Sequence, residues 1–464
     1  MTPAPAQPSA RVLVVGGGIS GLCCAYYLRK AGVSVLVLEQ SDQPGGYIRS
    51  AVRDACILEA GPQSFLSTDP LLEMIEDIGL QSELLVADPR APRYVLINGK
   101  LRPVPLAPPQ LLLSSLLAPR TKWKFIRDAL GHSRPPQQDE SVAAFIRRKF
   151  TAELLERLVG PFVSGVYAGD PERLSLRAAF PAPHQWETQH GSVIRGAMKS
   201  RPASAARHHS LITFRRGNQA LIHALAKSLG DALRCGVRVE SISRNVAAGK
   251  QEFAIQISQA GHATTLRTNA VIITTPADIA GRLLQDISPG FGALLHPIEY
   301  APVAVISSIY RRQQIGHPLA GFGFLVPRAE GLQILGTVWN SSLFPGRAPE
   351  GFAVLTSFAG GATNPGFLDL DDEAIKNFAA QELGPILSIQ GQPEQCVITR
   401  HRRALPQYNL GHSQRMDSLR RLYADFPGLF LAGNYFEGPS VGACVDLALR
   451  TAHQARDYLA SAGA

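Results

Sequence analysis

The chain has 464 residues, of which 45% are hydrophobic and 18% are charged, and its mean hydropathy is +0.02. This composition predicts two or three folded domains with substantial cores and excludes a disordered chain. Lysine and arginine number 46 against 37 acids, so the net charge is +9, which favours acidic lipid or a carboxylate-bearing substrate as partner. No nucleic-acid-binding motif is present, so nucleic acid is not expected.

The six cysteines form no C-x-x-C pair and no metal-ligand spacing with histidine. This pattern predicts free, mostly buried thiols in a reducing compartment and no metal site. The first ten residues, MTPAPAQPSA, lack the basic and apolar regions of a secretory signal, and no apolar run reaches the ~18 residues that span a bilayer. We therefore expect a cytoplasmic protein, with peripheral contact to the cytoplasmic membrane left open.

An apolar strand pattern, Val12 to Val15, runs directly into the glycine motif G-x-G-x-x-G. Gly16 permits the tight turn, Gly18 leaves room for a pyrophosphate, and Gly21 lets the following helix pack closely on the strand. The free N–H groups and positive dipole end of that helix favour phosphate. A second strand pattern ends at Glu39, where a carboxylate can accept both ribose hydroxyls of an adenine dinucleotide.

The glycine pair Gly45-Gly46 follows this acid. Nicotinamide enzymes do not need it, whereas flavoproteins of the amine oxidase and protoporphyrinogen oxidase superfamily carry one, and Gln43 to Ser50 resembles it closely. The next motif, Glu59 to Pro62, resembles a loop that passes close to a flavin ring, although a plain turn before a helix would look the same. Asn98-Gly99 then joins two short strand patterns, Arg93 to Ile97 and Lys100 to Pro103, and predicts a hairpin.

From Leu106 to Lys199 the pattern changes to helices broken by prolines. Its apolar piece, Ala107 to Pro119, is followed by Trp123 and several cations, and could lie on a membrane surface with the cations at the headgroups. An internal helix with a solvated basic flank explains the same residues equally well, so both interpretations stay open. The cations that follow the apolar piece are Arg120, Lys122 and Lys124.

The second half is richer in strands. The pattern Ala270 to Pro276 suggests that the chain returns to its first domain, and four further strand patterns suit the floor of a substrate domain. Near the end, an apolar strand runs into Ala432-Gly433-Asn434, and a helix begins at Ser440. The four strand patterns of the expected substrate domain cover Val303 to Tyr310, Gly321 to Val326, Gln333 to Trp339 and Ala353 to Phe358.

Gly438 to Gly442 also fits G-x-S-x-G, the nucleophile motif of α/β-hydrolases. That motif needs an acid and a histidine later in the chain that can reach the serine. Only 24 residues follow Ser440, and Asp446 and His453 fall on the same expected helix as the serine. We therefore reject a hydrolase triad here.

Together, these blocks resemble the oxygen-dependent protoporphyrinogen oxidases, most closely the plant and bacterial forms. The first and last blocks are shared by many flavin amine oxidases, whereas Pro161 to Pro171 and Gly321 to Pro327 are more specific. The resemblance implies FAD as cofactor and oxidation of protoporphyrinogen IX to protoporphyrin IX in haem or chlorophyll biosynthesis, with O2 as acceptor and H2O2 as product. The absence of an obvious acid–base dyad agrees with chemistry carried by the cofactor.

The corresponding fold class is mixed α/β, with a Rossmann-like FAD-binding domain, a β-rich substrate domain and a helical, membrane-associated insert. The FAD-binding domain is expected at 1–92, 205–268 and 405–464, the substrate domain at 93–106 and 269–404, and the insert at 107–204.

The resemblance also assigns residues. Arg93 matches the arginine that pairs with a substrate propionate, a task for which a planar guanidinium is suited. The expected substrate-binding residues are Arg93, Phe162, Gly169, Gly323, Leu325 and Phe358. The expected cofactor-binding residues are Gly16, Gly18, Ile19, Ser20, Gly21, Glu39, Gln40, Gly46, Tyr47, Gly61, Pro62, Val239, Asn434, Pro439, Ser440 and Val441.

Gln63 is a departure, since animal enzymes carry arginine there and plant forms an uncharged amide. Two alternatives stay open: a coproporphyrinogen III oxidase of the same family, and a non-catalytic flavin-bound membrane or assembly protein. An amine oxidase would share the flavin blocks but not the segments Val166 to Asp170 and Gly321 to Pro327. A homodimer and transfer of the product to a chelatase are likewise left open as partner interactions.

Overall fold

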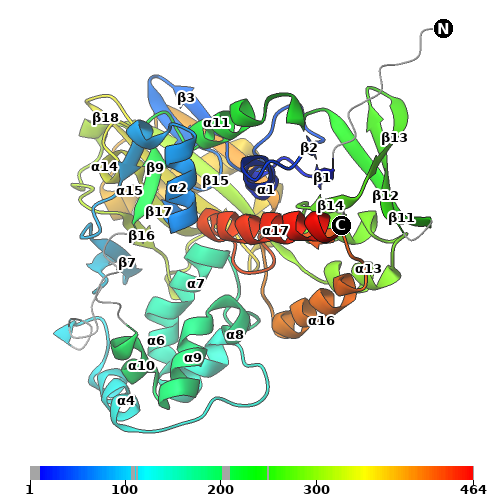
Figure 1. The fold of residues 1–464 in the computed structure, drawn as a ribbon. Coiled ribbons are helices and arrows are strands. Elements are labelled where there is room, and N and C mark those ends of the chain that lie inside the picture. Colours follow the sequence, from blue (N-terminus) through cyan, green and yellow to red (C-terminus); the bar gives the residue numbers. More distant parts are fainter. Residues whose placement is uncertain (1–10, 106–109, 111–112, 201–209, 248–249, 463–464) are drawn as a thin grey trace.

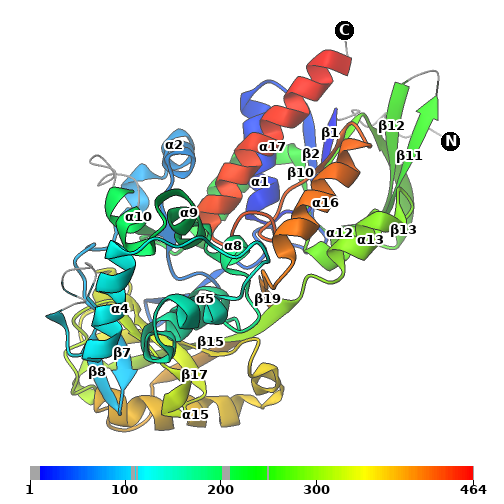
Figure 2. The same ribbon diagram turned by 90° about the horizontal axis from the view of Figure 1, so that it is seen from below.

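The computed structural model describes residues 11–105, 110, 113–200, 210–247 and 250–462, and its elements form two large sheets and a lobe of helices (Figure 1). The lobe, α4 to α10, lies at one end of the molecule. A three-stranded sheet, β11 to β13, lies at the opposite end (Figures 1 and 2). The expected mixed α/β fold is confirmed.

The first sheet is parallel and has the strand order β10-β2-β1-β14-β20. Its central strands are runs of aliphatic residues buried on both faces, as parallel strands between two layers require. The glycine turn follows β1 and Glu39 follows β2, at the carboxyl edge where such sheets bind ligands. The strands are β1 (Val12–Val15), β2 (Val35–Leu38), β10 (Leu233–Arg234), β14 (Ala270–Ile273) and β20 (Leu429–Leu431).

Alternate residues of β1 supply the two cores of this unit. Val12 and Val14 join the core under α1 (Ile19–Lys30), α2 (Asp69–Asp77), α11 (Gln219–Leu229) and α17 (Val441–Ala462). Leu13 and Val15 join the core on the opposite face. The elements of that face are β11 (Val237–Ala247), β12 (Lys250–Gln259), β13 (His262–Thr268), α12 (Ala277–Leu283), α13 (Pro289–Leu295) and α16 (His412–Ala424).

One expected domain boundary is wrong. The substrate domain was expected to resume at 269, but β14 pairs with β1 on one side and β20 on the other, inside the parallel sheet. The second sheet resumes only with β15, at Tyr300. The expectation that the Ala270 to Pro276 pattern returns to the first domain agrees with this pairing, so the boundary lies after β14.

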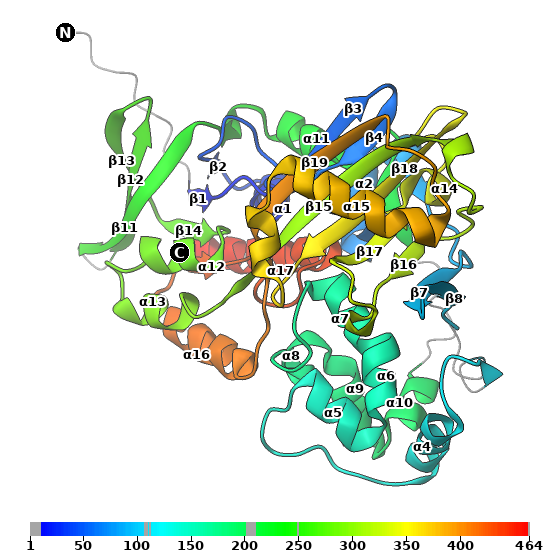
Figure 3. The same cartoon turned by 180° about the vertical axis from the view of Figure 1, so that it is seen from behind.

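The second sheet has the order β19-β15-β18-β17-β16-β7-β8, in which only β7 and β16 are parallel neighbours. The hairpin expected at Asn98-Gly99 is confirmed, since both residues have positive φ, 51° and 69°. Helix α15 (Asp372–Leu387) packs on one face of the sheet (Figure 3). The strands are β7 (Arg93–Ile97), β8 (Lys100–Pro103), β15 (Tyr300–Arg311), β16 (Gly323–Leu325), β17 (Ile334–Trp339), β18 (Phe352–Gly360) and β19 (Gln395–Pro406).

Short elements join the two sheets. The hairpin of β3 (Ser50–Arg53) and β4 (Cys56–Glu59) packs through Cys56 and Leu58 against Ile309 and Val354 of the second sheet. A further small sheet has the strand order β5-β9-β6. Its strands are β5 (Phe65–Leu66), β6 (Leu84–Val86) and β9 (Leu211–Phe214), and a short helix, α14 (Asn340–Leu343), follows β17.

The helical lobe has its own apolar core. Leu116 and Leu117 are buried in that core, while residues 107–109, 111 and 112 of the expected surface piece lie outside the described residues. Within the described chain, no helix is both long and apolar enough to cross a bilayer. The helices are α4 (Pro119–Leu130), α5 (Val142–Lys149), α6 (Ala152–Leu154), α7 (Gly160–Tyr167), α8 (Leu176–Ala179), α9 (Pro181–His190) and α10 (Val193–Lys199).

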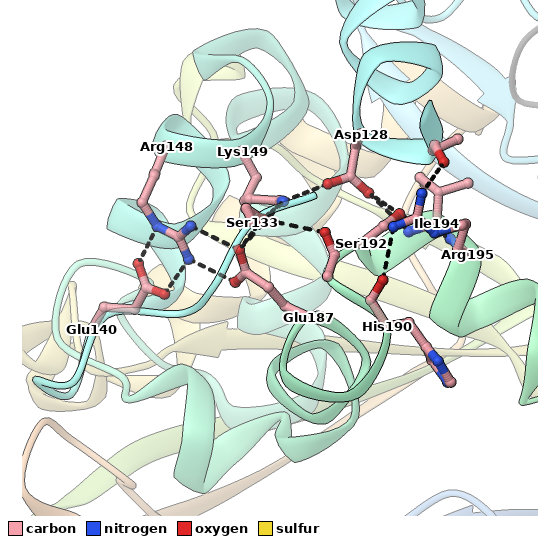
Figure 4. Close-up of polar contacts among 12 residues, drawn as sticks. Asp128, Ser133, Glu140, Arg148, Lys149, Glu187, His190, Ser192, Ile194 and Arg195 are labelled. Atoms are coloured by element: carbon pink, nitrogen blue, oxygen red, sulfur yellow. Dashed lines mark hydrogen bonds and ion pairs between the residues drawn. The ribbon is translucent and has the colours of Figure 1, made fainter. Parts of the chain in front are cut away.

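A buried network of charges holds the lobe together (Figure 4). Lys149 of α5 pairs with Asp128 of α4 and, at 3.3 Å, with Glu187 of α9. Arg148 pairs with Glu187 at 2.9 Å and with Glu140 at 2.6 Å. The side chains of Lys149, Asp128 and Glu187 are almost completely buried, so each charge depends on its partners.

The pKa of Glu187 shows how burial and ion pairing act against each other in this network. Burial tends to raise the pKa of its carboxyl, but hydrogen bonds from Arg148 and Ser133, together with the charges of Arg148 and Lys149, outweigh burial and lower the pKa to about 2. A carboxyl whose pKa is lowered on folding stabilises the fold above its ordinary pKa of 4.5. That stabilisation is lost as the pH falls from 4.5 towards 2.

We predict that Glu187→Gln destabilises the lobe by about 3 kcal/mol at pH 7, because it leaves buried cations without one of their anions. Urea unfolding followed by tryptophan fluorescence measures this, since Trp123 and Trp186 both lie in the lobe. The difference from wild type should shrink as the pH falls below 4.5.

The matched control is Glu172→Gln, which breaks the half-exposed pair with Arg147. Its cost should stay below about 1 kcal/mol. Equal costs for the two variants would contradict the structural role of the buried network.

Candidate active site

The loop between β1 and α1 has the geometry of a phosphate site. Gly16 has a φ of +106°, and a Cβ on Gly21 would lie only 1.9 Å from the carbonyl oxygen of Gly16. A Cβ on Gly18 would meet nothing within 4 Å. Gly18 is also the N-cap of α1 and offers no capping side chain, so the first N–H groups of the helix, from Ile19 and Ser20 onward, face this open space.

Glu39 lies against this loop. One carboxylate oxygen accepts a hydrogen bond from Gly17 N at 2.6 Å, and the other accepts one from Ser41 N at 2.8 Å. Each oxygen keeps a second lone pair for a ribose hydroxyl. The N–H of Val237 donates to the carbonyl oxygen of Glu39, so the half-buried Val239, two residues further along β11, lies near this acid. The side chain of Gln40 is exposed.

The second glycine pair meets the first. Gly45 N donates to Gly17 O at 2.8 Å, and a Cβ on Gly46 would lie 3.6 Å from the Cα of Gly18. Gly61 approaches the same segment, since its Cβ would lie 2.1 Å from the carbonyl oxygen of Tyr47. The structure therefore gathers these expected cofactor residues beside the phosphate loop.

Tyr47 and its neighbours form the next part of the surface. The Tyr47 ring meets His401 edge-on, with 4.9 Å between ring centres, and its hydroxyl donates to the carbonyl of Arg403. His401 Nε2 donates to Ala60 O at 2.6 Å. These contacts connect β19 of the second sheet to the Gly61-Pro62 loop.

Sequence reasoning missed the residue that fixes this loop. Arg347 forms a buried ion pair with Glu59, and each side chain is only 1% exposed. Glu59 also accepts hydrogen bonds from Asn218 N at 2.9 Å and Ser50 Oγ at 2.6 Å. The Asn218 side chain donates to Pro62 O at 2.8 Å. The pair has no local sequence signature, because its two residues are 288 positions apart.

The carboxyl-terminal block, residues 432–444, forms the remaining side of the site. Ser20, in the first turn of α1, hydrogen-bonds to Cys444, in the first turn of α17. Ser440 Oγ caps α17 by accepting from Ala443 N at 3.2 Å, which agrees with the rejection of a nucleophilic role. Asn434 lies just after β20, and Pro439 and Val441 flank the cap. The two helix N-termini thus lie together.

A cavity of about 490 Å³ lies between this block and the helical lobe. This volume is within the usual range for ligand sites. Its walls are largely apolar. From the lobe they comprise Val166, Tyr167, Ala178, Ala179, Phe180 and Pro181, and from the remainder Leu405, Glu437, Gly438, Pro439, Ser440 and Ala443.

The expected wall residues gather around α7. Leu325 packs on α7 so closely that a Cβ on Gly165 would lie 2.7 Å from it. Phe358 belongs to a cluster with Ala168 and Leu405, and the latter lines the cavity. Phe162 is 51% exposed and lies 5.6 Å from the ring of Phe180, another lining residue.

Gly169 is buried where a Cβ would meet Leu174 Cδ1 at 2.6 Å and Gln407 Oε1 at 2.8 Å. Close packing against the protein itself therefore already explains this glycine. Arg93 and Gly323 lie at the other end of β16, directly opposite each other in the strand register. Arg93 is exposed, its guanidinium lies 5.5 Å from the centre of the Phe322 ring, and it forms no ion pair with any residue the structure describes.

These features fit an adenine dinucleotide. Gly18 leaves an open cradle, and Glu39 presents a carboxylate. The buried hydroxyl of Thr275, two residues after β14 and beside Gly16, has no hydrogen-bond partner among the described residues. The described residues contain no group of acids, histidines and cysteines that could hold a metal ion.

Comparison with known proteins decides the family. The family model described as "Flavin containing amine oxidoreductase" matches residues 19–456. The chain belongs to the flavin-containing amine oxidoreductases. It is therefore an FAD-dependent oxidoreductase, in agreement with the cradle around Gly18.

Relatives within the flavin-containing amine oxidoreductases cover almost the whole chain. The chloroplastic protoporphyrinogen oxidase of rice, Oryza sativa subsp. japonica, is 36% identical, over 98% of this chain and 90% of the relative. The coproporphyrinogen III oxidase of Bacillus subtilis (strain 168) is 30% identical, over 97% and 98%. A solved structure described as a "putative protoporphyrinogen oxidase" from Exiguobacterium sp. 255-15 has a TM-score of 0.81 and 26% identity, covering 98% of this chain and all of that one.

The glycine geometry yields a prediction. Gly18→Ala should leave the apoprotein folded, because the new Cβ meets no protein atom. It should raise the dissociation constant for FAD about tenfold or more, because the Cβ enters the phosphate space. Gly21→Ala should instead destabilise the apoprotein. Thermal unfolding and quenching of flavin fluorescence measure the two effects separately.

The control is Gly384→Ala on helix α15, where a Cβ also meets nothing within 4 Å. Gly384→Ala should leave FAD binding unchanged. Unaltered FAD binding in Gly18→Ala would mean that the phosphates do not lie at this loop.

Proposed function

We propose that the protein oxidises a porphyrinogen to the corresponding porphyrin, with protoporphyrinogen IX as substrate and O2 as electron acceptor. The observation that carries this proposal is that porphyrinogen oxidases match the chain from end to end, including both sheets and the helical lobe. The cavity of about 490 Å³ beside the carboxyl-terminal block supports it, since its apolar walls suit a bulky ring.

The residues of the chain bind and orient the substrate, while the bound flavin supplies the hydride-accepting chemistry. Arg93, which has no ion-pair partner in the described part of the chain, offers its guanidinium to a substrate propionate. Leu325, Phe358 and Phe162 supply apolar wall. O2 is the proposed acceptor because the sequence contains no second glycine motif for a nicotinamide cofactor, and H2O2 would be the product.

The test is direct. Under anaerobic conditions, porphyrinogen should bleach the flavin absorbance of the purified protein, and admission of air should restore it with formation of fluorescent porphyrin and H2O2. No bleaching by any porphyrinogen would favour a non-catalytic flavoprotein.

A second candidate substrate is coproporphyrinogen III. The similarity to the Bacillus subtilis enzyme, over 97% of this chain, favours it. It carries four propionates, whereas protoporphyrinogen IX carries two, so a comparison of kcat/KM for the two porphyrinogens decides between them.

Arg93→Ala should raise KM for the preferred porphyrinogen about tenfold or more, because a charge-assisted hydrogen bond to carboxylate is lost. Steady-state assays of porphyrin fluorescence measure this, and Arg93→Lys should recover only part of the affinity, since an ammonium cannot bind bidentately.

Arg90→Ala is the matched control. The side chain of Arg90 is 90% exposed, lies three residues away and, within the described part of the chain, pairs with Asp88 at 3.4 Å. Its removal should leave KM unchanged. Unchanged kinetics in Arg93→Ala would remove Arg93 from the substrate site.

We further propose that the lobe contacts a membrane surface through α4. Trp123, Ile126 and Leu130 are exposed at helical spacing on one face of this helix. Exposed Met198 lies on α10, which packs against α4, and Arg127 provides a flanking cation. This arrangement supports peripheral binding to an anionic bilayer, with the protein otherwise in the cytoplasm.

Trp123→Glu should therefore abolish most co-sedimentation with phosphatidylglycerol-containing vesicles, because it places a charge in the apolar face. Val52→Glu is the control, since Val52 is equally exposed, 59% against 62%, but lies on β3 away from the lobe. Equal vesicle binding by both variants and the wild type would contradict membrane contact through α4.

A further inference from the structure

The segment from Asn434 to Gly438 links β20 to α17. It has no regular secondary structure of its own, yet it leads directly into Pro439, Ser440 and the N-terminus of α17. Its conformation therefore decides where the carboxyl-terminal part of the flavin site lies. Gly438 has a φ of +133°, a conformation open to few other residues, so the segment needs contacts that hold it in place.

Tyr408 supplies two of those contacts. Its hydroxyl donates to the carbonyl of Asn434 at 2.6 Å and accepts from Gly438 N at 2.7 Å. One phenol thus closes the segment at both ends. Tyr408 is only 1% exposed, so water does not compete for either hydrogen bond.

His412 supports Tyr408 and holds the middle of the segment. The two rings are stacked, with 4.2 Å between their centres and 9° between their planes. His412 Nε2 lies 2.9 Å from the carbonyl oxygen of Tyr435, which can only accept, so Nε2 is the donor. Burial lowers the pKa of His412 to about 4, so at neutral pH the ring is uncharged and stacks on the phenol without an unpaired charge.

The same stretch is joined to the helical lobe. Tyr408 O accepts from Ser175 N at 2.8 Å, and Gly411 N donates to Asp139 at 2.9 Å. The Asp139 carboxylate also accepts from Ser175 Oγ at 2.7 Å. The lobe that forms one wall of the cavity is thereby connected to the segment that forms the opposite wall.

We propose that Tyr408 and His412 are positioning residues for the flavin. They fix Asn434 to Gly438 so that Pro439, Ser440 and the first N–H groups of α17 are presented to the cofactor before it binds. This inference rests on the proposed binding of FAD at the carboxyl-terminal block, and it assigns the geometry of that block to two side chains outside it.

The experiment uses Tyr408→Phe, which keeps the stacked ring and removes only the hydroxyl. The dissociation constant for FAD should rise about tenfold, because the segment is no longer held in the bound conformation. Amide hydrogen exchange at Gly438 in the apoprotein should become faster. The midpoint potential of the bound flavin should shift, which a loss of overall stability alone would not produce.

Tyr27→Phe is the matched control. It removes a hydroxyl that donates to the carbonyl of Pro70 at 3.1 Å, away from the segment. Tyr27→Phe should lose a similar amount of thermal stability and keep the wild-type FAD affinity and potential. His412→Phe, which keeps a stacked ring but loses the Nε2 donor, should act in the same direction as Tyr408→Phe and serves if that variant does not fold.

Two outcomes separate the possible failures. If wild-type protein binds FAD and both Tyr408→Phe and His412→Phe bind it with unchanged affinity and potential, the positioning role is overturned. If the wild type binds no FAD, the assignment as a flavoprotein fails first, and the exchange rate of Gly438 still reports whether Tyr408 holds the segment.

Discussion

The buried ion pair between Glu59 and Arg347 sets the relation between the two sheets. Glu59 is the last residue of β4, two residues before Gly61. Arg347 lies four residues after α14, the short helix that follows β17 of the second sheet. Removal of either partner would leave an uncompensated charge in the interior, at a cost of about 3–5 kcal/mol. Because Asn218 and Ser50 share the same carboxylate, the pair fixes both the docking of the sheets and the path of the flavin loop.

The helical lobe is organised differently. Its strongest polar contacts, around Lys149 and Glu187, lie within the lobe itself, and its polar connection to the carboxyl-terminal block runs through the stretch beside Tyr408. The cavity therefore has walls from two parts of the chain that these hydrogen bonds connect.

Local patterns in the sequence were enough to predict the glycine turn, the Asn98-Gly99 hairpin and the helix after Ser440, because each depends on residues close together in the chain. Arg347 and Tyr408 were not singled out. Arg347 meets Glu59 across 288 residues, and the partners of the Tyr408 hydroxyl lie on another element, so neither role has a local signature. The boundary at 269 was misplaced although the Ala270 to Pro276 pattern itself suggested a return to the first domain, because a strand pattern does not show where the chain next leaves the sheet.

The ion pairs within the fold change what the net charge of +9 implies about the substrate. Many arginines that contribute to it are neutralised within the fold, for example Arg148 by Glu140 and Glu187, and Arg403 by Asp278. A diffuse positive field would attract any anion, and these ion pairs weaken that field. Arg93 instead lies at the start of β7, its guanidinium is 5.5 Å from the centre of the Phe322 ring, and it forms no ion pair with any residue the structure describes. The proposed selection of a carboxylate-bearing substrate therefore rests on where this guanidinium lies, and only weakly on the total charge of the chain.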